Sequence, residues 1–177
     1  MKNLANFKIL VLAFGLFSGV VAGQKISSKN VKTVVTGTST MHDWSMTSNT
    51  GSFTANVSGN ALTDVQYTLG AKSLKSGKGA MDSNAYKALE ADKFPNITFT
   101  ATSVNIGKGT MTGKLKVTDV TKTVSFPVTV AKSANGYTIT GTETIKLTDY
   151  GVTPPSFMMN TVKTGNDIKI TVSVNAN

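Results

Sequence analysis

The chain has no cysteine and no arginine among its 177 residues, and its only histidine is His42. The missing cysteine excludes disulfide bonds, a thiol nucleophile and a lipid-modified amino terminus, so packing and sheet hydrogen bonds must hold the fold. The missing arginine removes the bidentate fork that grips phosphate groups and guanine edges. One histidine with scattered acids lacks the clustering of metal ligands. The sequence therefore predicts neither a metal nor a cofactor.

Catalytic constellations are missing as well. No serine lies in a Gly-x-Ser-x-Gly context, so no acyl-transfer set can be assembled. His42 and Asp43 are the only adjacent histidine and acid. Without a nucleophile, His42 is expected either to pack near Trp44 or to contact a ligand headgroup. The chain is therefore predicted not to be an enzyme.

All 18 basic residues are lysines, and they stand against 9 acidic residues. Removal of Lys2 and Lys8 with a leader would leave a net charge of about +7. Because these lysines are scattered along the chain and no arginine accompanies them, nucleic acid is not a predicted partner. The charge favours solubility and a mild attraction to membrane headgroups, so a peripheral membrane contact stays an open expectation.

The first residues have the pattern of a secretory signal peptide. Lys2 and Lys8 flank or precede an apolar run from Ile9 to Val21, and the small residues Ala22-Gly23 follow. The run of about 13 residues is shorter than the roughly 20 that span a bilayer, which disfavours the alternative of an uncleaved anchor. We expect a signal peptide at 1–23, one domain at 24–177, and export to the periplasm or the medium without lipidation.

Apolar residues alternate with polar ones through most of the remaining chain. Examples of the apolar series are Val65, Tyr67 and Leu69; Ile97, Phe99 and Ala101; and Ile168, Ile170, Val172 and Val174. Threonine, with 27 of 177 residues, is concentrated on the opposite parity, as expected for β-branched residues on solvated strand faces. Short turns such as 134–136 and 165–167 favour hairpins. The pattern predicts an all-β fold of about eight antiparallel strands, closed into an up-and-down barrel.

One interior segment, Gly77–Phe99, departs from this alternation. A short α-helix is predicted over Asp82–Ala91, with Asp82 or Ser83 capping its start and Pro95 ending the run by Phe94. Its apolar face consists of Met81, Ala85 and Leu89. A lone amphipathic helix in an all-β chain must bury this face against the sheet, and the open end of the barrel is a natural place. We expect the helix to form a lid or side wall there.

Three stretches resemble one known family. "MDSNAYKALEADKFPNITF" at Met81–Phe99 looks like the central motif of the YceI-like family, and the resemblance recurs at Met111–Val130 ("MTGKLKVTDVTKTVSFPVTV") and Lys146–Val152 ("KLTDYGV"). Members are bacterial periplasmic and secreted lipocalin-like proteins associated with binding polyisoprenoids and other long-chain amphiphiles. The resemblance implies an eight-stranded lipocalin-like barrel with one short helix between strands, and a lipid-binding role.

The chain departs from the family at the expected headgroup position. Many members carry an Arg-Asp pair at the start of the central motif, where this chain has Met81-Asp82. Lys78 or Lys93 could replace that arginine only as a point charge. A neutral or weakly polar head, as in a quinone-like or fatty amphiphile, is therefore as consistent with the resemblance as a pyrophosphate.

Two groups of residues are candidates for contact with such a ligand. The apolar candidates are Trp44, Tyr67, Leu69, Met81, Tyr86, Leu89, Phe94, Phe99, Phe126, Phe157 and Met158. The polar headgroup candidates are His42 and Glu143. Glu143 falls on the apolar parity of its strand, so either a bulge near Gly141 turns it outward or it lies at the barrel mouth as a polar anchor.

The predicted function is that of an exported lipid-binding protein that sequesters or carries an isoprenoid-type or other long-chain amphiphile in the barrel. The apolar candidates would equally form a plain core, because core and pocket share the same inward faces in a small barrel. The alternative is accordingly a structural or stress-related envelope protein with a filled barrel that acts through partner or membrane contacts. The oligomeric state stays open, a dimer included.

Overall fold

The computed structural model describes residues 23–157 and 161–177. Most of the predicted signal peptide and the ligand candidate Met158 therefore lie outside the described residues, and so does the side chain of Phe157.

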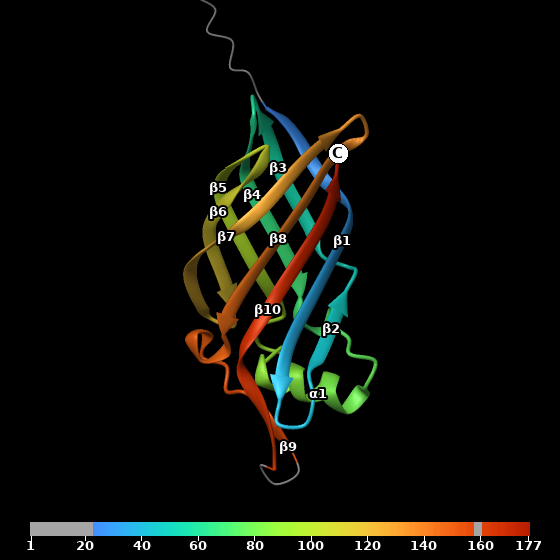
Figure 1. Cartoon of the computed structure of the whole chain (residues 1–177), viewed down its shortest axis with the longest axis vertical. Helices are drawn as coiled ribbons and strands as arrows, with labels where there is room; N and C mark the ends of the chain where they lie inside the picture. The colour runs from blue at the N-terminus through green and yellow to red at the C-terminus, as the bar shows by residue number, and fades with distance from the viewer. Residues whose placement is uncertain (1–22, 158–160) are drawn as a thin grey trace, which may run out of the picture.

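Eight strands form a closed antiparallel barrel, as predicted (Figure 1). They are β1 (Gln24–Ser39), β3 (Ser52–Ser58), β4 (Ala61–Gly70), β5 (Asn96–Asn105), β6 (Gly107–Val117), β7 (Val120–Ser133), β8 (Gly136–Lys146) and β10 (Val162–Ala176). Neighbours in the barrel follow this order, and β10 pairs back with β1. The sheet thus has no free edge along most of its length, which removes the hazard of edge-to-edge pairing.

Two short strands extend the barrel at one end. β2 (Trp44–Ser48) pairs with Thr33–Gly37 of β1, whereas β3 pairs with Gln24–Ser27 of the same strand. β2 and β3 therefore follow one another along one side of β1. β9 (Ser156–Phe157) pairs with the start of β10.

The single α-helix, α1 (Gly79–Ala88), lies across this end of the barrel (Figure 1). The prediction of Asp82–Ala91 was wrong by three residues at each end. At the start, Lys78 occupies the capping position without a side-chain cap. Asp82 lies one turn inside the helix, where its carboxylate accepts hydrogen bonds from the Ser76 N–H at 2.7 Å and the Ser76 hydroxyl at 2.6 Å.

The end of α1 is set by Glu90, which takes a left-handed conformation with φ of 46°. The Glu90 N–H donates to the Lys87 carbonyl and the Ala91 N–H to the Tyr86 carbonyl, which is the Schellman arrangement. The helix thus stops well before Pro95, and glutamate at a position that usually holds glycine gave no signal of it. In residues 23–157 and 161–177, no helix is long and apolar enough to cross a membrane.

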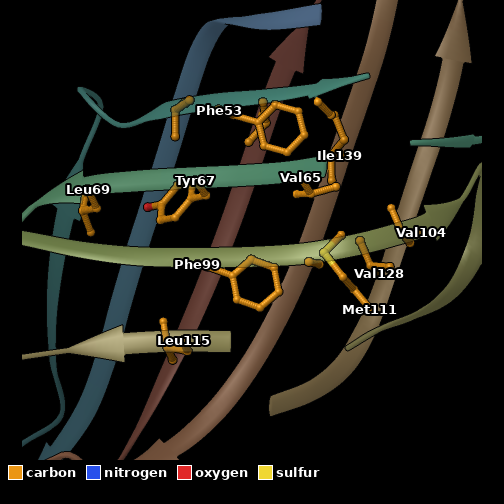
Figure 2. Packing of buried hydrophobic residues seen from close by; sticks show 14 of the residues in the cluster. Phe53, Val65, Tyr67, Leu69, Phe99, Val104, Met111, Leu115, Val128 and Ile139 are labelled. Carbon is orange, nitrogen blue, oxygen red and sulfur yellow. The ribbon is translucent and has the colours of Figure 1, made fainter. Parts of the chain in front are cut away.

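Inward side chains fill the barrel at the end opposite α1. This closed end is packed with Ile26, Leu62, Val104, Val130, Tyr137 and Ala176, all of them buried. Burying one such aliphatic side chain contributes roughly 1.5–3 kcal/mol. Nearer the middle, Phe53, Tyr67 and Phe99 project from three neighbouring strands into the same interior (Figure 2). Threonines of the opposite parity, such as Thr100 and Thr140, face solvent.

Candidate ligand-binding site

The barrel contains a cavity of about 450 Å³ that extends from its middle to the end at α1. This volume falls within the roughly 300–1,000 Å³ typical of small-molecule sites. The buried residues of the closed end do not line it, whereas the exposed residues His42, Lys78 and Ala80 do. The cavity therefore reaches solvent beside α1 and is blind at the other end.

Most of the predicted apolar candidates lie in the cavity wall. These are Trp44, Tyr67, Leu69, Met81, Leu89, Phe99 and Phe126. Contact of these residues with a ligand stays a prediction. The wall also contains apolar residues that were not singled out from the sequence, such as Met111, Leu115 and Ile139, although their inward parity placed them on the correct face.

Two candidates, Tyr86 and Phe94, lie outside the cavity wall. The Tyr86 hydroxyl donates to the carbonyl oxygens of Leu74 at 2.6 Å and Lys72 at 3.0 Å. It thereby ties α1 to the preceding segment. Phe94 is half-buried in the turn after the helix, where the Lys93 ammonium lies 4.8 Å from its ring centroid. Neither aromatic residue lines the cavity, and Tyr86 supports the position of α1.

α1 presents its apolar face to the cavity, as its periodicity predicted. Met81, Ala85 and Leu89 all line the cavity. Two attachments hold the helix there, namely the Tyr86 hydroxyl and the Asp82 carboxylate. Hydrogen bonds from the Ser76 hydroxyl and N–H lower the pKa of Asp82, because they stabilise its ionised form. The role of α1 as a moving lid stays a prediction.

The β1–β2 turn lies at the same end of the barrel as α1 and contributes residues to the mouth of the cavity (Figure 1). The Trp44 ring packs directly against Gly37. A Cβ atom at Gly37 would stand only 2.4 Å from Cζ2 of the indole. Its Nε1–H donates to the Thr38 carbonyl at 2.9 Å. His42 is exposed, and its Nδ1 donates to the Asp43 carbonyl at 2.8 Å. The predicted polar candidate His42 is therefore placed at the mouth, where it could meet a ligand only as that ligand enters or protrudes.

Two polar side chains inside the barrel satisfy one another. Thr33 is fully buried, and its Oγ1 lies 2.6 Å from the hydroxyl of Tyr67. Burial raises the pKa of Tyr67 to about 12, against a smaller opposing effect of the hydrogen bond with Thr33. This pair needs no ligand to complete its hydrogen bonding.

Glu143, the other polar candidate, lies within the cavity wall and not on the outside. β8 pairs with β10 in unbroken register from Tyr137 to Lys146, which excludes the bulge near Gly141, one of the two alternatives for Glu143. What occurs at Gly141 is the end of the pairing between β8 and β7. Its missing side chain makes room for Phe126, whose Cε2 would stand 2.9 Å from a Cβ. Burial raises the pKa of Glu143.

Tyr150 is among the polar wall residues that sequence reasoning missed. It ends the short 3-10 helix η2 (Leu147–Tyr150), and its hydroxyl is buried without a hydrogen-bond partner among the residues that the structure describes. It lies in the "KLTDYGV" stretch, but irregular structure after β8 carries no periodicity that could have assigned it inward. Within the described ranges, no group of three or more histidine and acidic side chains is placed to hold a metal ion.

Comparison with known proteins assigns this barrel. The family model of the YceI-like domain matches residues 25–176. The chain belongs to the YceI-like family. No curated protein sequence matches it significantly.

Solved structures of bacterial proteins share the fold. BcnA of Burkholderia cenocepacia superposes with a TM-score of 0.68 at 19% identity, over 83% of this chain and 96% of that one. A polyisoprenoid binding domain from Saccharophagus degradans, described as implicated in plant cell wall breakdown, gives 0.65 at 11% identity, over 86% and 97% of the two chains. A YceI protein of Campylobacter jejuni gives 0.57 at 20% identity, over 71% and 79%. At these identities the likeness concerns the fold alone.

Proposed function

We propose that this protein binds a polyisoprenoid or another long-chain amphiphile in the barrel cavity and so sequesters or carries it. The observation that carries the proposal is the apolar cavity of about 450 Å³, blind at one end and open beside α1. A slender apolar chain fits such a site because its surface is removed from water along its whole length. Burying about 500 Å² of the surface of such a chain would contribute on the order of 10 kcal/mol of favourable free energy. The entropy lost on association must be subtracted from this value.

Two further observations support this proposal. The chain belongs to the YceI-like family, and one structural neighbour is described as a polyisoprenoid binding domain. A barrel with about 450 Å³ of unfilled space is also a poor fit to the alternative of an envelope protein with a filled interior. The proposed activity needs neither a cofactor nor covalent chemistry, and its ligands include polyisoprenoid, quinone-like and fatty amphiphiles.

The proposal includes export to the periplasm or the medium. β1 begins at Gln24, one residue after the predicted signal peptide at 1–23, so cleavage there would leave every barrel strand intact. In an envelope compartment, a soluble carrier would shield an isoprenoid chain from water between membranes. No nucleic acid is proposed as a partner.

Lipid analysis of a matched pair of variants tests the proposal. Ile170 and Lys169 are neighbours on β10, but Ile170 lines the cavity whereas Lys169 faces solvent. We expect native mass spectrometry to detect a bound amphiphile on the wild-type protein and on Lys169→Trp, and to find it strongly reduced on Ile170→Trp, whose indole fills the cavity.

Organic extraction of the same samples then identifies the amphiphile. Thermal unfolding of both variants establishes that they are folded before their lipids are compared. The proposal fails if the wild-type protein, purified from its envelope or offered prenyl lipids, carries none. It also fails if Ile170→Trp carries as much as the wild type, because the ligand would then be bound elsewhere.

A further inference from the structure

The Tyr150 hydroxyl is an exception among the polar groups of the interior. Tyr150 is only 2% exposed, and no residue in the described ranges offers its hydroxyl a hydrogen bond. Buried hydroxyls in native proteins nearly always have a partner, because losing water without replacement is unfavourable. Tyr67, which lines the same cavity, follows that rule through Thr33. An unpartnered hydroxyl at a ligand cavity indicates that the ligand supplies the partner.

Glu143 is a second polar group of the cavity wall that has no hydrogen bond or ion pair among the described residues. It lines the same cavity, and burial is the sole cause that raises its pKa, with no hydrogen bond or cation compensating. In register, Glu143 stands opposite Ile170, which in turn faces Val35. Glu143 is half-buried, and its partner across the β8–β10 ladder is aliphatic. Within residues 23–157 and 161–177, it is the one acidic side chain of the cavity wall.

The two groups come from consecutive elements. Glu143 is on β8 and Tyr150 ends η2, which follows β8 directly, and both residues line the cavity. Burial, followed by the negative charges of Glu143 and Asp149, raises the pKa of Tyr150. Of these two acids, only Glu143 lines the cavity. Asp149, by contrast, faces outward, where its carboxylate lies 3.8 Å from the Lys122 ammonium.

The backbone that carries Tyr150 is firmly held. Thr118, in the tight turn between β6 and β7, is buried and donates from its Oγ1 to the Tyr150 carbonyl at 2.8 Å. Gly151 follows in a left-handed conformation, with φ of 70°. Glu143 is on a strand with unbroken pairing to β10. The phenol and the carboxylate are thus positioned before any ligand arrives, which lowers the entropic cost of using them.

The charged residues of the cavity wall determine which ligand headgroup can bind there. A phosphate or carboxylate head would be repelled by Glu143, and the described cavity residues that could offset this, Lys78 and His42, are at the exposed mouth. A neutral hydroxyl has the matching pattern, because it donates one hydrogen bond and accepts another. Building on the proposed function, we propose that Glu143 and Tyr150 form a polar subsite that binds the hydroxyl of a neutral long-chain alcohol. The alcohol O–H donates to the Glu143 carboxylate, and the Tyr150 O–H donates to the alcohol oxygen.

Three ligands with the same prenyl chain test this subsite. The purified, delipidated protein is titrated with a C20 prenyl alcohol, its methyl ether and its monophosphate by calorimetry. The ether keeps the oxygen acceptor but cannot donate to Glu143. We expect the alcohol to bind about tenfold more tightly than the ether, because this ratio corresponds to the free energy of one hydrogen bond to a charged group. The phosphate should bind most weakly.

Variants connect this preference to the two residues. Glu143→Gln is expected to reduce the alcohol-to-ether ratio to about threefold or less and to improve phosphate binding relative to the alcohol, because it removes the repelling charge. Tyr150→Phe is expected to weaken the alcohol and the ether alike by about fivefold, since both lose the donor to their oxygen. Tyr137→Phe, at the closed end, should leave all three affinities unchanged. Tyr150→Phe should also be no less stable than the wild type without ligand, because the lost hydroxyl had no partner.

The outcomes separate the subsite from the binding function. Equal binding of alcohol and ether, or a ratio that Glu143→Gln leaves intact, overturns the subsite while the apolar binding function stands. Tightest binding of the phosphate also overturns it. If none of the three prenyl ligands binds, both the subsite and the proposed function are wrong.

Discussion

Thr33 on β1 and Tyr67 on β4 join two strands that do not pair with each other, through a 2.6 Å contact between their hydroxyl groups inside the barrel. The contact gives each of the two buried hydroxyl groups a hydrogen-bond partner in a mostly apolar interior. Burial of Tyr67 makes the ionised phenol unfavourable in the folded state. Stability at alkaline pH should therefore depend on this residue.

We predict that Tyr67 lowers the stability of the protein above pH 10. The pKa of Tyr67 is raised from 10.0 to about 12 in the folded state. Above pH 10 the unfolded chain releases the phenolic proton while the folded chain keeps it, so the free energy of unfolding falls as the pH rises to about 12. The contribution is up to about 3 kcal/mol, at about 1.4 kcal/mol per pH unit. Urea unfolding at pH 9 and pH 11.5 measures it, and Tyr67→Phe should show a smaller decrease than the wild type. Parallel decreases in the two proteins would contradict the assignment.

We predict that α1 controls the rate of ligand exchange. Tyr86→Phe removes the hydrogen bonds to the Lys72 and Leu74 carbonyls, which tether the helix, but leaves the cavity wall unchanged. Entry and release of a fluorescent lipid should both become about fivefold faster, with a smaller change in affinity, because gating acts on both rates. Stopped-flow exchange measures this, with Tyr137→Phe as the control. Unchanged rates would mean that α1 is a fixed wall.

We predict that Gly141 and Phe126 are coupled. A methyl group at Gly141 would meet Cε2 of the Phe126 ring at 2.9 Å, so Gly141→Ala should destabilise the barrel by about 1–3 kcal/mol. In the background of Phe126→Leu, which removes the ring, the same substitution should have a much smaller effect. A double-mutant cycle of unfolding free energies gives the coupling directly. Additive effects of the two substitutions would show that the ring moves aside at no cost.

We predict that the mature protein begins at Gly23 or Gln24. The basis is the short apolar run of Ile9–Val21, followed by small residues and then by the start of β1 at Gln24. Amino-terminal sequencing of the protein from envelope fractions decides the matter. A membrane-extracted species that still carries Met1 would refute cleavage.

Period-two alternation was the part of the sequence that predicted most of the fold. It placed Val65, Tyr67 and Leu69 on one face of a strand, and the structure confirms that all three are buried. Alternation succeeds because one face of each strand meets an apolar interior and the other meets water. It could not show whether that interior is filled, since the packed closed end and the cavity wall use the same residue types.

The errors lie where local hydrogen bonds override the pattern. Asp82 has the chemistry of a helix cap, but it accepts hydrogen bonds from Ser76 outside the helix, so the helix begins earlier. Glu90 adopts a conformation that side chains rarely take, and nothing in its residue type signals this. Glu143 lines the cavity, as the parity of its strand indicates, and the alternation alone could not exclude an outward bulge. Tyr150 lies in irregular chain that the alternation does not reach.

The closure of the barrel by its first and last strands has a consequence for how the protein folds. Val35 on β1 is paired with Ile170 on β10, near the opposite end of the sequence. Contacts between such distant segments form slowly, on the order of milliseconds to seconds in barrel-like domains. Since β10 supplies Ile168, Ile170 and Val172 to the cavity wall, any folding intermediate without β10 exposes the apolar lining and has no enclosed site. Refolding in the presence of a fluorescent lipid should therefore show capture no earlier than the docking of β10.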